Sequence, residues 1–360
     1  MQKNLQKNDI FKIGKKVINK GKTFIVAEIS SNHNNSFTRA KKLILRAKKA
    51  GADAIKLQTF TADTITLNSN KKDFKLKYLK KNKSWSKYKN FYEMYKKAST
   101  PWSWHKDLFE FAKKIKIEIF SSPFDESAVD FLEKLNCIAY KVASPEITHI
   151  PLLDKIAKTK KPVIISTGLA EENDIKLALK TLKKYGNKKI VILKCNSSYP
   201  AEPDDSDLKN ISYLKERFNL PVGFSDHSIG NIVPVAAVSL GACVIEKHFN
   251  LSDKVKTLDS FFSTSEKEFE DMIEKIREVE KVLGKFNYRI CRNSMPNLRV
   301  RRSIYVSKNI NVGEKISKSN IKVVRPSYGL HPKYYSKIVG KKVKRNLEKG
   351  HRLKLQDIKI

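Results

Sequence analysis

Short runs of Val and Ile recur along the first 285 residues and alternate with polar or helix-like stretches. Such runs, bounded by turn residues, are typical of buried parallel strands. Eight runs meet this description: 23–30, 54–59, 118–122, 139–143, 163–167, 190–195, 222–225 and 243–248.

Between most of these runs, apolar residues return with the period of an amphipathic helix. In 36–50 one face carries Ala40, Leu43, Ile44 and Ala47. The segments 127–135 and 171–185 behave similarly, and 232–240 is apolar enough for a buried helix. Eight strands alternating with helices predict an α/β fold, a closed (β/α)8 TIM barrel. A doubly wound sheet is the alternative, but no glycine-rich phosphate fingerprint follows the first strand.

Two regions depart from this rhythm. Residues 68–100 form a long connection rich in Lys, Tyr and Trp, which we interpret as a lid or an insertion. After Gly284, short runs at 303–306, 321–324 and 337–343 are separated by turn signals. We therefore predict three parts: a barrel over 1–285, a linker over 286–300 and a small, mostly β domain over 301–360.

Composition limits the cellular setting. No apolar run approaches the roughly 18 residues of a membrane span, and the Lys-rich N-terminus lacks the apolar region of a signal peptide. We expect a cytoplasmic protein with no membrane role. The four cysteines stand singly, as core residues in a reducing compartment do: Cys137, Cys195, Cys243 and Cys291.

The formal net charge is +36, from 73 basic and 37 acidic residues. One interpretation is binding to nucleic acid phosphates, and the other is a lysine-rich composition combined with an anionic substrate. The lysines are spread along the chain, and no nucleic-acid-binding motif is present. We do not expect nucleic acid binding as the primary role, although a basic RNA-binding protein stays the alternative from another class.

Two successive predicted strands end in His227 and His248, 21 residues apart. Parallel strands would bring both imidazoles to one rim, where they could hold a divalent metal. The alternative is two unrelated histidines, one of them a core residue. Glu246 and Lys247 could equally face outward beside His248.

The other predicted strands also end in polar residues. Lys56 and Lys141 lie inside strands, where a buried cation needs a partner, and lysines with hydroxyls can bind phosphate or carboxylate. A carboxylate such as Glu28 can transfer protons. A structural ion pair with a barrel glutamate is the alternative for these three residues.

Taken together, these motifs resemble the sialic acid synthase family. They are AEISSNH at 27–33, AIKLQT at 54–59, FSSPF at 120–124, YKVAS at 140–144, ISTG at 165–168, GFSDH at 223–227 and IEKHF at 245–249. The tail resembles that family's antifreeze-like (SAF) domain. The stretch RPSYGLHPKYY at 325–335 looks like the branch that makes pseudaminic acid.

The resemblance implies a metal-dependent enzyme, using Mn²⁺ or Mg²⁺, that condenses phosphoenolpyruvate with an open-chain N-acetylated amino sugar. In the pseudaminic branch the sugar is 2,4-diacetamido-2,4,6-trideoxy-L-altrose. Phosphate leaves by C–O cleavage, so water adds at C2 of phosphoenolpyruvate. N-acetylneuraminate and legionaminate synthesis stay open, as does a Schiff-base aldolase using Lys56 or Lys141.

The resemblance also assigns roles by position. Glu28 and Asp259 correspond to catalytic carboxylates, and His227 and His248 to metal ligands. The residues that correspond to phosphoenolpyruvate contacts are Lys56, Ser122, Lys141, Ser144, Ser166, Ser197 and Ser225. Those on the sugar side are Gln58, Phe124, Glu146, Tyr199 and Arg325.

Two details qualify these roles. Position 197 is Ser where the neuraminate branch has Asn, so a hydroxyl replaces an amide at this contact. Arg325 corresponds to an arginine that reaches the partner subunit's site, so a domain-swapped homodimer is expected.

Overall fold

The computed structural model describes residues 10–76, 84–252, 255–284 and 287–359. Its internal contacts divide the chain into two compact units, Met1–Gly284 and Lys285–Ile360. Each unit buries a hydrophobic core of its own.

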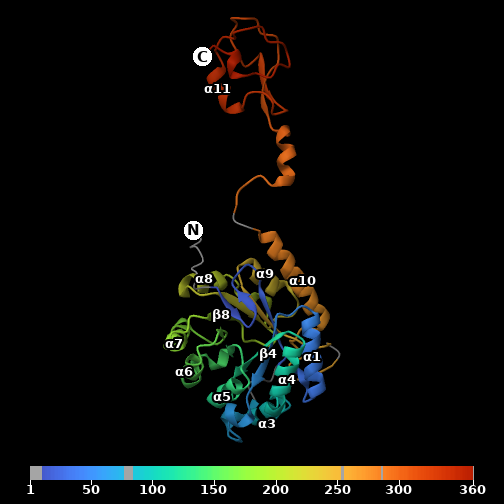
Figure 1. Cartoon of the computed structure of the whole chain (residues 1–360), viewed down its shortest axis with the longest axis vertical. Coiled ribbons are helices and arrows are strands. Elements are labelled where there is room, and N and C mark those ends of the chain that lie inside the picture. The colour runs from blue at the N-terminus through green and yellow to red at the C-terminus, as the bar shows by residue number, and fades with distance from the viewer. Residues whose placement is uncertain (1–9, 77–83, 253–254, 285–286, 360) are drawn as a thin grey trace. The chain divides into compact units, whose positions relative to one another are not determined.

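The first unit is a closed barrel of parallel strands surrounded by helices (Figure 1). The strands follow one another in sequence around the barrel, and the last pairs with the first. The predicted TIM barrel is confirmed, and each of the eight predicted runs overlaps one strand, with β5 and β9 each extending one residue further than predicted. The strands are β3 (Phe24–Glu28), β4 (Ala54–Thr59), β5 (Glu118–Pro123), β6 (Tyr140–Val142), β7 (Val163–Ser166), β8 (Ile190–Cys195), β9 (Val222–Asp226) and β10 (Val244–His248).

Helices cover the outside of the barrel, and most of them carry one apolar face, whereas α9 is apolar almost all round. In α1 the predicted face is buried, and Ser36 caps the helix by accepting the N–H of Arg39 at 3.2 Å. The helices of this unit are α1 (Phe37–Lys49), α2 (Ala62–Ile65), α3 (Phe91–Ala98), α4 (Trp102–Lys114), α5 (Glu126–Lys134), α6 (Ile150–Lys158), α7 (Glu172–Lys183), α8 (Asn210–Phe218), α9 (Ile232–Ser239) and α10 (Glu266–Leu283).

A hairpin precedes the barrel and was not predicted. It pairs β1 (Phe11–Ile13) with β2 (Lys16–Ile18) around Gly14, whose φ of 56° is left-handed. The backbone N–H of Lys15 donates to Glu118, at the start of β5. Ile13 and Ile18 are buried in the barrel's core cluster, so the hairpin covers the amino-terminal ends of the strands.

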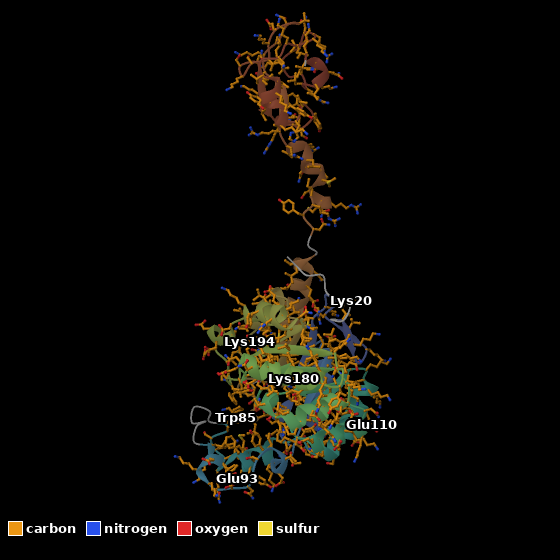
Figure 2. All side chains as sticks on the ribbon, turned by 90° about the vertical axis from the view of Figure 1, so that its left-hand side faces the viewer. Lys20, Trp85, Glu93, Glu110, Lys180 and Lys194 are labelled. Atoms are coloured by element: carbon orange, nitrogen blue, oxygen red, sulfur yellow. The ribbon has the colours of Figure 1, made fainter. Side chains whose placement is uncertain are left out.

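The long connection between β4 and β5 contains α2, a 3-10 turn at Lys72–Phe74 and α3. Residues 77–83 lie outside the described part of the chain, so the lid stays a prediction. Figure 2 shows Trp85 of this connection on the same side of the barrel unit as Glu93 of α3.

The second unit contains a small antiparallel sheet. Strand β11 (Ser303–Val306) pairs with β12 (Ile321–Val324), as predicted from two of the short runs. The prediction of a third strand from the run 337–343 was wrong. The first two residues of this run end helix α11 (Tyr335–Ile338), and Gly340 then turns the chain with a φ of 88°. Ile338 is buried, but it belongs to a helix and not to a strand with alternating buried residues. The pattern of apolar residues alone could not distinguish these two cases.

A buried carboxylate stabilises the end of the second unit. Asp357 accepts hydrogen bonds from Arg345 Nε at 2.9 Å, from His351 Nε2 at 3.0 Å and from the N–H of Lys354 at 3.0 Å. These partners lower the pKa of Asp357 although burial alone would raise it. Within the described ranges of both units, no helix is long and apolar enough to cross a membrane.

Candidate active site

Four charged side chains meet inside the barrel at the carboxyl ends of its strands. Strand register places Glu28 beside Lys56 and His248. Lys56 Nζ lies 2.8 Å from Glu28 Oε2 and 2.8 Å from Glu246 Oε1. Lys141 Nζ lies 3.5 Å from the same Glu246 oxygen and donates to Ser166 Oγ at 2.7 Å. The ion pair that the sequence left open is therefore present, within a cluster of two lysines and two glutamates.

Glu246 is the member of this cluster that the sequence analysis did not assign. Alternate residues of a strand face the same side, so Glu246 shares its side with His248. Ser225 Oγ also donates to it at 3.1 Å. Burial would raise the pKa of Glu246, but Lys141 and Lys56 lower it to about 2. Lys247, by contrast, forms an ion pair with Asp226 and donates to the Ser228 carbonyl.

Burial also changes the acidity of Lys56. Its pKa falls to about 8, because burial and the neighbouring Lys141 oppose the charge more than Glu246 supports it. An additional anion close by would favour the charged ammonium. A bound anion would therefore raise the pKa of Lys56 back toward its usual value.

Other predicted hydroxyl groups lie at or after the ends of the strands β5, β6 and β8. Ser144 Oγ accepts the N–H of Gly168 at 3.0 Å. A Cβ on Gly168 would lie 2.3 Å from Ser197 Oγ, so only glycine allows this close approach. Ser122 Oγ and Ser197 Oγ are buried without a hydrogen-bond partner in the described structure. Buried hydroxyls usually have partners, and these two are available to a polar ligand.

His227 and His248 lie next to each other, with ring centroids 5.3 Å apart. His227 Nδ1 lies 2.7 Å from the Asn196 carbonyl, and His248 Nδ1 lies 3.3 Å from Ser30 Oγ. Hydrogen bonds at Nδ1 orient an imidazole so that Nε2 can bind a metal. Burial, then His227, lowers the pKa of His248 well below its usual value, which keeps that ring neutral.

The two imidazoles fit a divalent metal with few protein ligands. Among the described residues, no cluster of three or more His, Cys, Asp or Glu side chains is arranged to hold a metal. Two protein ligands would leave open positions for substrate and water. The Cys195 thiol, 3.9 Å from His227 Nδ1, was not assigned from the sequence. Burial opposes a charged His227, yet this thiol raises the pKa of that histidine.

Ser30 links Asp259 to His248, and the sequence analysis did not assign this serine to the site. Asp259 Oδ2 accepts from the hydroxyl of Ser30 and, at 2.6 Å, from that of Ser31. Both serines lie in the 3-10 turn Ser30–His33 that follows β3. Only the fold reveals this link, because Asp259 lies more than 200 residues further along the chain.

The predicted sugar-side residues occupy different surroundings. Tyr199 packs on His227 at 4.4 Å and Phe124 on Phe60 at 5.0 Å, both between ring centroids. Burial raises the pKa of Glu146 to about 7, and its Oε2 has no partner among the described atoms. Gln58 is half-buried on β4. Arg325 belongs to the second unit, where it is exposed directly after β12.

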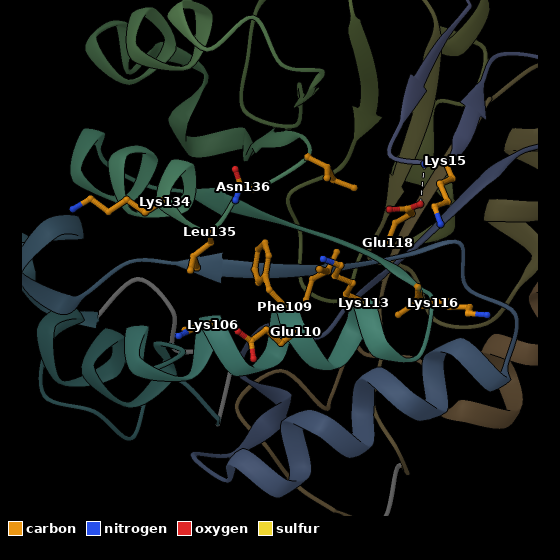
Figure 3. Close-up of a pocket in the computed structure, with 13 residues that line it drawn as sticks. Lys15, Lys106, Phe109, Glu110, Lys113, Lys116, Glu118, Lys134, Leu135 and Asn136 are labelled. Atoms are coloured by element: carbon orange, nitrogen blue, oxygen red, sulfur yellow. Dashed lines mark hydrogen bonds between the residues drawn. The ribbon is translucent and has the colours of Figure 1, made fainter.

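A separate cavity of 710 Å³ lies on the outside of the barrel (Figure 3). Phe109 of α4 and Leu135 after α5 contribute its apolar lining, and Lys106, Lys113 and other lysines surround them. None of the described buried polar atoms that lack a partner lines this cavity. Glu118 at its edge begins β5, so the cavity lies away from the strand ends that carry the ionisable cluster.

Comparisons with known proteins agree with these features. A model of the NeuB family matches residues 43–288, and a model of the SAF domain matches residues 301–359. The chain is 46% identical over 338 residues to the pseudaminic acid synthase of Campylobacter jejuni, covering 94% of this chain and 97% of that protein. It is 40% identical over 334 residues to an N,N'-diacetyllegionaminic acid synthase of Legionella pneumophila, covering 91% and 92%.

A solved structure extends the likeness to the fold. The Bacillus subtilis spore coat polysaccharide biosynthesis protein spsE has a TM-score of 0.65 and 31% identity, covering 98% of this chain and 99% of that one. The chain is therefore an enzyme of the NeuB family that ends in a SAF domain.

Proposed function

We propose that this enzyme condenses phosphoenolpyruvate with 2,4-diacetamido-2,4,6-trideoxy-L-altrose and water, giving pseudaminic acid and phosphate. The observation that carries the proposal is the 46% identity, over nearly the full length of both chains, with a protein named pseudaminic acid synthase. The barrel rim supports it, because the two buried lysines and the two imidazoles come from the same barrel.

Phosphoenolpyruvate binds on the lysine side of the site. Lys56 and Lys141 attract its phosphate and carboxylate, and the serine hydroxyls complete the contacts. Ser122 and Ser197 support this assignment, since their buried hydroxyls have no partner among the described residues.

The sugar aldehyde binds beside His227 and His248, which hold a divalent metal, Mn²⁺ or Mg²⁺. When bound, the metal acts as a Lewis acid toward the aldehyde. C3 of phosphoenolpyruvate forms the new C–C bond with the aldehyde carbon, and water adds at C2. Glu28 accepts one proton from this water, and the former aldehyde oxygen takes up a proton as it becomes a hydroxyl. The bond between C2 and the phosphate oxygen then breaks, and phosphate leaves with the second proton as C2 becomes a carbonyl. Asp259 orients the site through Ser30.

Phosphate release tests this proposal. The enzyme is incubated with phosphoenolpyruvate, Mn²⁺ and one of three sugars: the trideoxy-altrose, N-acetylmannosamine or the diacetamido-mannose analogue. We expect the altrose derivative to give the highest kcat/KM and a chelator to abolish turnover. Trapping of pyruvate on Lys56 or Lys141 by borohydride would instead indicate a Schiff-base aldolase.

Legionaminate synthesis is the second candidate function. The observation that favours it is the 40% identity with the Legionella N,N'-diacetyllegionaminic acid synthase. Preference for the diacetamido-mannose analogue would establish it in place of pseudaminate synthesis.

A domain-swapped homodimer, in which Arg325 of one copy completes the sugar site of another, is part of the proposal. Mixing Arg325→Ala with His227→Ala tests it, because one site in a mixed dimer then has both residues. Recovery of activity after mixing supports the domain swap. If the two variants form mixed dimers but the mixture stays inactive, the domain swap is contradicted.

A further inference from the structure

Four aromatic rings gather beside the two histidines. Trp85, from the connection between β4 and β5, lies 5.6 Å from Tyr199 and 5.6 Å from Phe261 between ring centroids. Phe262 lies 6.2 Å from Trp85 and 4.9 Å from Tyr199. Three segments far apart in the sequence therefore build one aromatic cluster, which we call the aromatic wall: Trp85, Tyr199, Phe261 and Phe262. Phe262 is buried, whereas Trp85, Tyr199 and Phe261 are partly exposed.

The aromatic wall begins at the imidazoles. Phe262 packs on His248 at 4.6 Å, and Tyr199 packs on His227 at 4.4 Å. Trp85 packs on both of these aromatic rings. A molecule held by one end at the imidazoles therefore has aromatic carbon surface next to it, against which its apolar atoms can pack.

A hydrogen bond fixes the position of Trp85. Its Nε1 donates to the Leu258 carbonyl at 3.1 Å, next to Asp259. Because the N–H is already used there, the indole offers carbon surface, and no further donor, to a neighbouring ligand. Figure 2 shows where this side chain lies on the barrel unit.

We propose that Trp85 determines which sugar the enzyme prefers, by contacting the end of the sugar that is remote from the aldehyde. This inference rests on the proposed function. In the trideoxy-altrose that end is a methyl group, which an aromatic surface accommodates. A hydroxymethyl group at the same place would lose hydrogen bonds to water without regaining them from carbon atoms. The aromatic wall therefore favours 6-deoxy sugars over their 6-hydroxy analogues.

Two substitutions separate the ring from its hydrogen bond. Trp85→Ala removes the apolar surface, whereas Trp85→Phe keeps most of it and removes only the N–H. We expect Trp85→Ala to raise the KM for the trideoxy sugar about 10-fold, and to reduce the preference over a 6-hydroxy analogue by a similar factor. Trp85→Phe should retain most of the preference, and the KM for phosphoenolpyruvate should stay unchanged in both variants.

Trp104→Phe is the matched control, because Trp104 packs on His33 and Phe37 outside the site. It should leave the sugar preference unchanged. If Trp85→Ala keeps the wild-type preference for the trideoxy sugar, the role of Trp85 is overturned. A wild type that uses only N-acetylmannosamine overturns the proposed function instead, and the two failures are distinguishable.

Fluorescence provides a readout that does not depend on turnover. The chain has three tryptophans, so the double variant Trp102→Phe, Trp104→Phe emits from Trp85 alone. Adding the trideoxy sugar should change this emission in a saturable way. Emission that stays constant while the same variant turns over the sugar contradicts the contact.

Discussion

At the residue scale, Glu246 is a buried carboxylate whose charge is compensated by two lysines. Its carboxylate is buried between two ammonium groups and accepts a serine hydroxyl, and its second oxygen, Oε2, is buried without a partner. Removing one partner of a buried ion pair leaves an uncompensated charge in a medium of low polarity. Glu246 therefore holds Lys56 and Lys141 in place as well as neutralising them.

Replacing Glu246 by Gln tests this role. The substitution keeps the shape of the side chain but removes its charge, so we expect a loss of about 3 kcal/mol in the free energy of unfolding. Urea unfolding measures this change. Glu110→Gln is the control, because Glu110 is an exposed glutamate of α4. Equal stability of the two variants would contradict the structural role of Glu246.

His227→Ala should remove metal binding while the fold stays intact. We expect calorimetric titration with Mn²⁺ to lose its binding isotherm and metal-dependent phosphate release to disappear, with an unchanged circular dichroism spectrum. His149→Ala serves as the matched control, since His149 is a half-exposed histidine before α6. Undiminished Mn²⁺ binding by His227→Ala would exclude this histidine as a ligand.

At the element scale, the start of α4 packs against β4 and the turn after β3 through two buried histidines. His33 Nε2 lies 3.1 Å from Thr100 Oγ1, and His105 Nε2 lies 2.9 Å from Thr59 Oγ1. Burial lowers the pKa of each ring to about 4, with the neighbouring His105 as a further cause for His33. Both rings are therefore neutral in the folded protein at neutral pH.

These two histidines predict a loss of stability in acid. Between pH 6.5 and 4 the unfolded chain binds protons that the folded chain does not, so the free energy of unfolding falls as the pH falls. The full effect is about 3 kcal/mol for each ring. Urea unfolding from pH 7 to 4 measures it, and His105→Gln should show a smaller pH dependence than the wild type. Parallel curves for the two proteins would contradict this cause.

The sequence predicted the elements of the barrel better than the details of its site. Buried parallel strands leave continuous Val and Ile runs, so all eight strands were found. The side that Glu246 faces depends on strand register, and the approach of Asp259 to Ser30 depends on a contact between distant loops. The run 337–343 failed for a related reason, because a one-turn helix and a strand can bury the same apolar residues.

At the scale of the whole molecule, the chain combines two units with separate cores and unequal charge. Residues 286–360 contain 20 Lys or Arg and 3 Asp or Glu. One of these three acidic residues, Asp357, is buried and contacts basic side chains. Separate cores predict that the second unit can lose stability without affecting the barrel.

Asp357→Asn tests this independence. Losing charged hydrogen bonds with Arg345 and His351 should cost about 2 kcal/mol in the second unit. Differential scanning calorimetry should show a lower transition for that unit and an unchanged transition for the barrel. Glu348→Gln, an exposed change in the same unit, is the control. A single transition that shifts as a whole would show that the units unfold together.

The balanced charges at the barrel rim have a thermodynamic consequence. Lys56 and Lys141 are already matched by Glu28 and Glu246, so a multiply charged anion enters a locally neutral site. A divalent cation on the imidazoles would supply the missing positive charge. Anion and cation then assist each other, and linkage requires that each tighten the other's binding by the same factor. Neither affinity is a property of the protein alone, and each has meaning only at a stated concentration of the other ion.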